Sequence, residues 1–72
     1  MLAKEREYNK GIAMKLRSTR IKTNITQEQL AEYLGVTFQQ VQKYEKGTNR
    51  LSGGKIKMLC EFFEVPIGYF FK

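Results

Sequence analysis

The sequence of 72 residues contains no histidine and no tryptophan, and it has a single cysteine and a single proline. One cysteine cannot form an internal disulfide, and without histidine it has no partners for a zinc site. We therefore expect no metal ion, no cofactor and a reducing, cytosolic environment. Cys60 is expected to be a small buried hydrophobe.

Long apolar runs are also absent. No stretch approaches the roughly 18 apolar residues of a membrane span, and the N-terminus lacks the apolar centre of a signal peptide. The chain has no glycine-rich phosphate loop, and its acids are scattered without a cleft to gather them. We expect neither export, nor membrane insertion, nor enzymatic activity.

Acidic residues are few relative to basic ones. Lys and Arg number 13 against 7 Asp and Glu, a formal net charge of +6. This excess favours an anionic partner, nucleic acid first and an acidic membrane second. Residues 1–25 hold seven of the cations and two of the acids, so this segment should attract phosphate most strongly.

The apolar spacing predicts an all-α, compact domain of five short helices, residues 10–72, after a charged lead-in, residues 1–9, that we expect to fray. Ile12, Ala13 and Leu16 recur at helical spacing in the first helix, from about Lys10 to 23–24. A chain of this length has one small core and little room for a deep substrate cavity.

Two helix starts follow within a few residues. Thr26-x-x-Gln29 is a capping box, and Thr37-x-x-Gln40 is a second one. Gly35 lies between them, where a left-handed residue ends a helix at low cost. The chain is thus predicted to turn sharply between a second and a third helix.

The C-terminal part predicts two further helices. Ser52 can cap a fourth helix, which Val65–Pro66 should end because the residue before proline avoids the helical region. Pro66 can begin a short fifth helix, 67–71. The inner stripe of the fourth helix is Ile56, Leu59, Cys60 and Phe63.

A helix, a tight turn with glycine and a second helix together make the helix-turn-helix pattern, whose second helix enters the DNA major groove. Apolar or small residues occupy the inward positions of both helices. They are Leu30, Ala31, Leu34, Val36, Val41 and Tyr44.

The stretches TQEQLAEYLGVT, YEKG and VPIGYFF resemble the Cro/repressor-type helix-turn-helix family of bacterial and phage transcription regulators. The resemblance extends from about Gly11 to Phe71. It implies a lambda-repressor-like fold and a cytoplasmic, bacterial or phage-encoded regulator that binds double-stranded DNA.

The resemblance also implies roles for individual residues. Phe38, Gln39 and Lys43 would face base edges, and Arg20 would form a structural ion pair with Glu45. Phosphate contacts are expected from Gln27, Thr37, Lys46, Asn49 and Arg50.

The residues themselves support a reading role for the third helix. With Val41 and Tyr44 inward, polar side chains lie on the opposite side, namely Gln39, Gln42, Lys43 and Lys46. Glutamine can pair with adenine, lysine with guanine, and an exposed Phe38 can contact a thymine methyl group or simply cover the helix start. For each residue alone, a solvated helix surface is the ordinary alternative.

Apolar side chains near the C-terminal end are candidates for a dimer interface. They are Met58, Phe62, Phe70 and Phe71. Relatives of this kind dimerise near this end, which places two recognition helices roughly 34 Å apart on a palindromic operator.

The sequence therefore predicts a sequence-specific DNA-binding transcription regulator, a repressor acting as a homodimer. The alternative is an antitoxin or adaptor module whose main role is to bind a protein partner such as a toxin. Peripheral binding to an anionic membrane is weaker, because the apolar face of the first helix is needed for the core.

Overall fold

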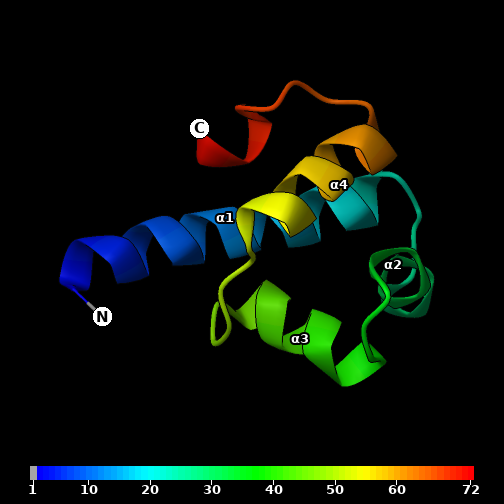
Figure 1. Ribbon diagram of the computed structural model, residues 1–72, viewed down its shortest axis with the longest axis horizontal. Coiled ribbons are helices and arrows are strands. Elements are labelled where there is room, and N and C mark those ends of the chain that lie inside the picture. Colours follow the sequence, from blue (N-terminus) through cyan, green and yellow to red (C-terminus); the bar gives the residue numbers. More distant parts are fainter. Residues whose placement is uncertain (1) are drawn as a thin grey trace.

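The computed structural model describes residues 2–72, which form four α-helices and one short 3-10 helix. No strand occurs within these residues, so the all-α class is confirmed. Figure 1 shows α1 crossing the molecule, with α3 below it and the C-terminal turn above it. The elements are α1 (Ala3–Lys22), α2 (Gln27–Leu34), α3 (Phe38–Lys46), α4 (Gly53–Phe63) and η1 (Tyr69–Phe71).

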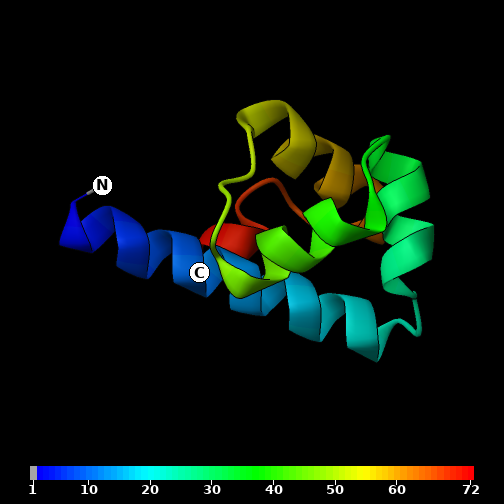
Figure 2. The ribbon, with the colours of Figure 1, turned by 90° about the horizontal axis from the view of Figure 1, so that it is seen from below.

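Helix α1 begins at Ala3 rather than near Lys10, so the predicted start of the first helix is wrong, and the described part of the lead-in 1–9 is helical from Ala3. Met1 lies outside the described residues. The segment is rich in strong helix formers, and Glu5 lies in the first turn, where a negative charge is favourable. Figure 2 shows this half of α1 extending past the other helices. The helix ends where predicted, with Asn24 at a left-handed φ of 60°.

The caps of α2 and α3 differ. The Thr26 hydroxyl accepts a hydrogen bond from the Gln29 amide at 3.0 Å, and Oε1 of Gln29 accepts one from the Thr26 amide at 2.8 Å. This confirms the first capping box. The Thr37 hydroxyl accepts from the Gln40 amide at 3.1 Å, but among the described residues the Gln40 side chain makes no return bond. The second box is therefore only half formed.

Helix α4 begins as predicted, because the Ser52 hydroxyl accepts a hydrogen bond from the Lys55 amide at 3.1 Å. It ends at Phe63, since Glu64 adopts a left-handed φ of 55° before the Val65–Pro66 pair is reached. The predicted fifth α-helix is wrong. Only the 3-10 turn η1 forms there, closed by bonds from the Tyr69 amide to the Pro66 carbonyl and from Phe71 to Gly68.

The core lies among the four helices and is closed by η1. A hydrogen bond of 2.9 Å between the hydroxyls of Thr19 and Tyr69 ties η1 to α1, and Nζ of Lys15 lies 4.4 Å from the centroid of the Tyr69 ring. Phe70, a predicted dimer-interface residue, is only 1% exposed, so its ring completes the core and offers almost no surface to a second copy. The largest fully buried side chains are Phe70, Leu16, Leu30, Leu59 and Val41.

Candidate nucleic-acid interface

The turn between α2 and α3 fixes how α3 is presented. Gly35 has a φ of 70°, and the amide of Val36 donates to the carbonyl of Ala31 at 3.0 Å. Space around Gly35 is open, so glycine is required by its backbone angle rather than by crowding. Ala31 is 4% exposed, and its small side chain lets the two helices approach closely.

Helix α3 separates into a buried and an exposed side. Val41, Tyr44 and Glu45 are buried against the rest of the molecule. Phe38 is 38% exposed, so it reaches solvent at the start of the helix while keeping part of its ring covered. We call the solvent side the outer face of α3. It consists of the exposed Phe38, Gln39, Lys43 and Lys46 and the half-buried Gln42.

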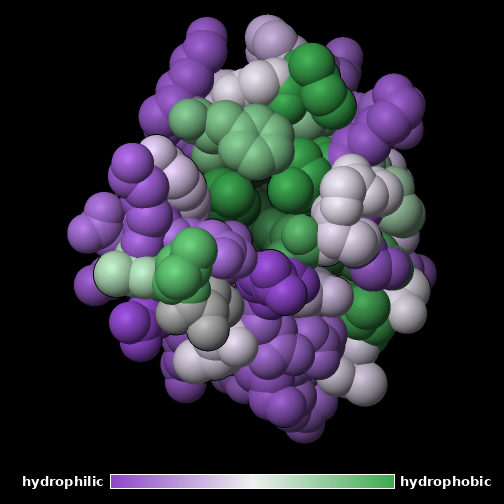
Figure 3. Space-filling view, turned by 60° about the vertical axis from the view of Figure 1, so that its left-hand side comes forward, coloured by the Kyte–Doolittle hydropathy of each residue, from purple (hydrophilic) through white to green (hydrophobic). Residues whose placement is uncertain are grey.

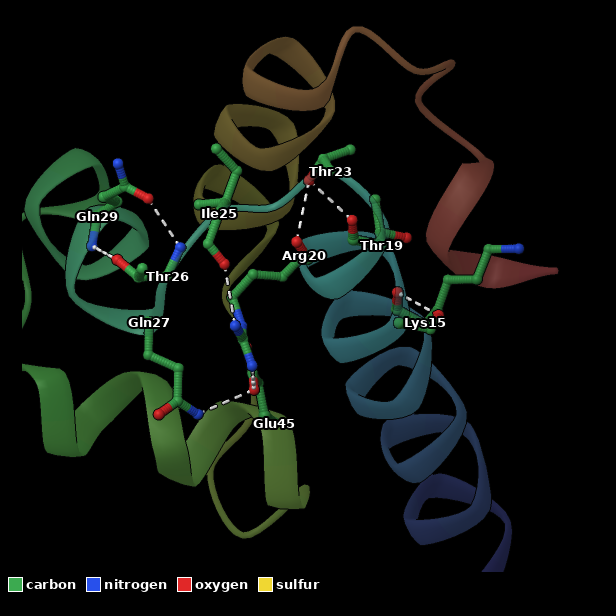
Figure 4. Close-up of polar contacts among 10 residues, drawn as sticks. Lys15, Thr19, Arg20, Thr23, Ile25, Thr26, Gln27, Gln29 and Glu45 are labelled. Atoms are coloured by element: carbon green, nitrogen blue, oxygen red, sulfur yellow. Dashed lines mark hydrogen bonds and ion pairs between the residues drawn. The ribbon is translucent and has the colours of Figure 1, made fainter.

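A buried ion pair anchors α3 from behind. Nε and Nη2 of Arg20 in α1 donate to the two carboxylate oxygens of Glu45 at 2.6 and 3.0 Å. Nη1 of Arg20 donates to the carbonyl of Ile25 at 3.0 Å, as Figure 4 shows. The Glu45 side chain is 3% exposed. This fork neutralises the acid nearest the outer face and fixes the rotation of α3 about its own axis.

Gln27 belongs to the same network. Its side-chain amide donates to Oε1 of Glu45 at 3.0 Å, so α2 is tied to α3 at this point. Gln27 is also the first residue of α2, where backbone amides have no partner inside the helix. An anion approaching this helix start would meet the backbone amide and the positive end of the helix dipole.

A surface hollow joins α1 to the outer face of α3. It is lined by Arg17, Gln27, Gln42, Glu45 and Lys46. The structure thus brings together three of the predicted contact residues, Gln27, Gln42 and Lys46, and adds Arg17, to which no role was predicted. Helical spacing carries a signal for Arg17, because it lies three residues before Arg20, the partner of Glu45.

The other predicted phosphate residues lie elsewhere. Thr37 is exposed, but its hydroxyl already caps α3. Asn49 and Arg50 follow α3 in the exposed loop, where Nη1 of Arg50 lies 3.4 Å from a carboxylate oxygen of Glu5 in α1. Both side chains of this pair are about half exposed or more, so the pair is weak and Arg50 can exchange its partner for phosphate.

Of the dimer candidates, Phe71 is the one left largely free, at 63% exposed. Met58 and Phe62 are half-buried against the core, and the Phe62 ring lies 4.5 Å from that of Tyr33. Phe71 lines an apolar hollow with Tyr8 and Ile12 of α1. Figure 3 shows this side of the molecule, with apolar side chains around a hollow in its upper half.

Cys60 shows no feature of a reactive thiol. It is 4% exposed, and burial raises the pKa of its thiol, against the opposing effect of the Lys57 charge. At neutral pH it is therefore protonated and poorly nucleophilic. Residues 2–72 contain no group of three or more metal-ligating side chains and no helix with the length and apolar character to cross a membrane.

The chain matches the helix-turn-helix family over residues 16–70. It is 41% identical over 61 residues to an uncharacterized HTH-type transcriptional regulator of Sinorhizobium medicae (strain WSM419), and 44% identical to one of Sinorhizobium fredii. One of Rickettsia prowazekii is 43% identical over 61 residues. These alignments cover 85% of this chain and 43–47% of the relatives, so the chain spans about half the length of the curated relatives it matches.

Proposed function

Because the chain belongs to the Cro/repressor-type helix-turn-helix family of DNA-binding transcription regulators, we propose that it recognises a specific operator with α3 and represses transcription there. One observation carries the proposal. The outer face of α3 collects amide and ammonium groups, while Arg20 and Glu45 hold the helix rigidly from behind. We place this activity in the cytoplasm of a bacterium, where a bound repressor blocks the promoter by occupying it.

Base reading follows from the chemistry of the outer face. Gln39 and Gln42 each offer a donor and an acceptor, which match N6 and N7 of adenine. Lys43 offers only donors and therefore prefers O6 and N7 of guanine. Phe38 supplies apolar contact to a thymine methyl group, for which its exposed edge is available.

Phosphate contacts orient the protein without reading sequence. We assign this task to the α2 start at Gln27, to Thr37 through its backbone amide, and to Lys46, Asn49 and Arg50 at the end of α3. These groups lie at both ends of the outer face, so they would hold the two backbones that border one major groove.

We propose further that two copies bind one palindromic operator. A second copy would cover the apolar hollow at Phe71, Tyr8 and Ile12, because this surface is otherwise exposed. A two-fold pair places the recognition helices roughly 34 Å apart, one turn of DNA.

The same hollow supports the second candidate function, an antitoxin or adaptor that binds a protein partner such as a toxin. An apolar surface of this kind fits an apolar segment of another protein as well as a second copy. A stable heteromeric complex after affinity purification would favour this function, and recovery of homodimer alone would favour the repressor.

Selection of bound sites from random duplex DNA tests the proposed function. We expect an enriched palindrome that binds at least about a thousandfold more tightly than a scrambled duplex, in anisotropy titrations at two salt concentrations. No enrichment, together with weak binding that disappears as salt rises, would show that only the general positive charge acts.

Two lysines of α3 provide a matched test that separates base contacts from phosphate contacts. Lys43→Ala should weaken binding to the selected site by about 1–3 kcal/mol and leave scrambled DNA almost unaffected. Lys46→Ala removes the same charge from the same helix and should weaken both duplexes alike. Equal losses on both duplexes for Lys43→Ala would remove it from the base-reading set.

A further inference from the structure

Three cations of α1 form a row along the helix: Arg6, Lys10 and Arg17. They are separated by four and seven residues, and at about 3.6 residues per turn these spacings keep them in a narrow arc of the helix surface. All three are exposed, and none forms an ion pair with another of the described residues. We call this set the cationic row.

The cationic row runs beside the C-terminal end of α3. The Cα of Lys10 lies 3.6 Å from the position that a Cβ on Gly47 would take, directly after α3. Arg17 lines the same hollow as Gln42 and Lys46 of the outer face. The lower half of Figure 3 shows the side on which α3 lies in Figure 1, and it is mostly hydrophilic.

Most other cations are occupied within the molecule or lie away from this row. Lys4 and Lys22 are on the opposite side of α1, as the helical spacing requires. Ion pairs, a ring contact or a backbone carbonyl engage five more cations, namely Lys15, Arg20, Arg50, Lys55 and Lys57. The cations of the cationic row thus have no acidic partner among the described residues, and they lie next to α3.

We propose that the cationic row binds the DNA backbone beside the segment that α3 reads, as a second line of phosphate contacts. This inference rests on the proposed function. From Arg6 to Arg17 the helix spans about 16 Å, so its three cations can each contact a separate phosphate of one strand. The row touches no base, so it adds affinity for every sequence and no discrimination among sequences.

Two triple variants with the same loss of charge test the inference. One changes the row, Arg6→Gln, Lys10→Gln and Arg17→Gln. The control changes Lys4→Gln, Lys22→Gln and Lys57→Gln, which lie off the row and away from the hollow at Phe71. Both are titrated by anisotropy against the selected and scrambled duplexes over a series of salt concentrations, after circular dichroism has shown that both are folded.

The logarithm of the association constant falls as the logarithm of the salt concentration rises, and we expect this fall to be shallower in the row variant by about 2–3, at about 0.9 per phosphate. The row variant should also lose about a hundredfold in affinity at 0.15 M salt. The loss should be the same on both duplexes, so the preference between them is kept. Equal losses in the two triple variants would overturn the inference, and so would a lost preference in the row variant. If the unchanged protein prefers no sequence, the proposed base reading by α3 fails. The comparison of the two triple variants on the scrambled duplex would still test whether the cationic row contacts phosphates.

Discussion

Replacing Arg20 with alanine is expected to lower the free energy of unfolding by about 3–5 kcal/mol, measured by urea denaturation followed by circular dichroism. Glu45 is 7% exposed and would lose both of its guanidinium bonds. The Gln27 side chain alone would remain beside the carboxylate, at 3.0 Å. A buried charge with one neutral donor is costly because it has given up its hydration without an opposite charge.

Two controls separate the lost pair from the lost arginine. The double change Arg20→Met and Glu45→Met leaves no unpaired charge, so it should recover most of the stability. Arg17→Ala removes an exposed arginine from the same helix and should change the free energy of unfolding by less than about 0.5 kcal/mol. A loss for Arg17→Ala as large as that for Arg20→Ala would contradict the role given to the buried pair.

Phe70→Ala should destabilise the protein to a similar extent, by about 3–5 kcal/mol, because it empties a fully buried site. The Phe70 ring lies 5.0 Å from that of Tyr69 and 6.5 Å from that of Phe63, and it is 1% exposed. Thermal and urea unfolding monitored by circular dichroism would measure the loss.

The neighbouring phenylalanine is the matched control. Phe71 is 63% exposed, so Phe71→Ala should leave the free energy of unfolding within about 0.5 kcal/mol of the original. Its expected effect is instead on the association of two copies, measured by sedimentation. If Phe71→Ala destabilised the monomer as much as Phe70→Ala, the assignment of Phe70 to the core and of Phe71 to the surface would be wrong.

Local chemistry made the α2–α3 unit predictable. A threonine cap, a glycine with positive φ and a second threonine cap act within a few residues, so the local sequence is enough to predict the turn between α2 and α3. The pairing of Arg20 with Glu45 came from the family resemblance, and spacing alone would not have selected Glu45 from the other acids.

Tertiary packing decided the parts that were not predictable. Nothing local distinguishes Phe70 from Phe71, because the two rings differ only in whether η1 turns them toward the core. Glu64 ends α4 in a conformation that a non-glycine residue adopts only at some cost, which sequence rules assign to glycine or asparagine. The placement of Arg17 beside Lys46 likewise requires the α1–α3 contact.

Helix α1 holds both α3 and the C-terminal turn η1. Arg20 grips α3 from this helix, and Thr19, the adjacent residue, holds η1 through Tyr69. The helix has no proline and no break between Ala3 and Lys22. Displacing η1 would break the Thr19–Tyr69 hydrogen bond one residue away from the arginine that holds α3, so the C-terminal turn and the outer face of α3 share one support.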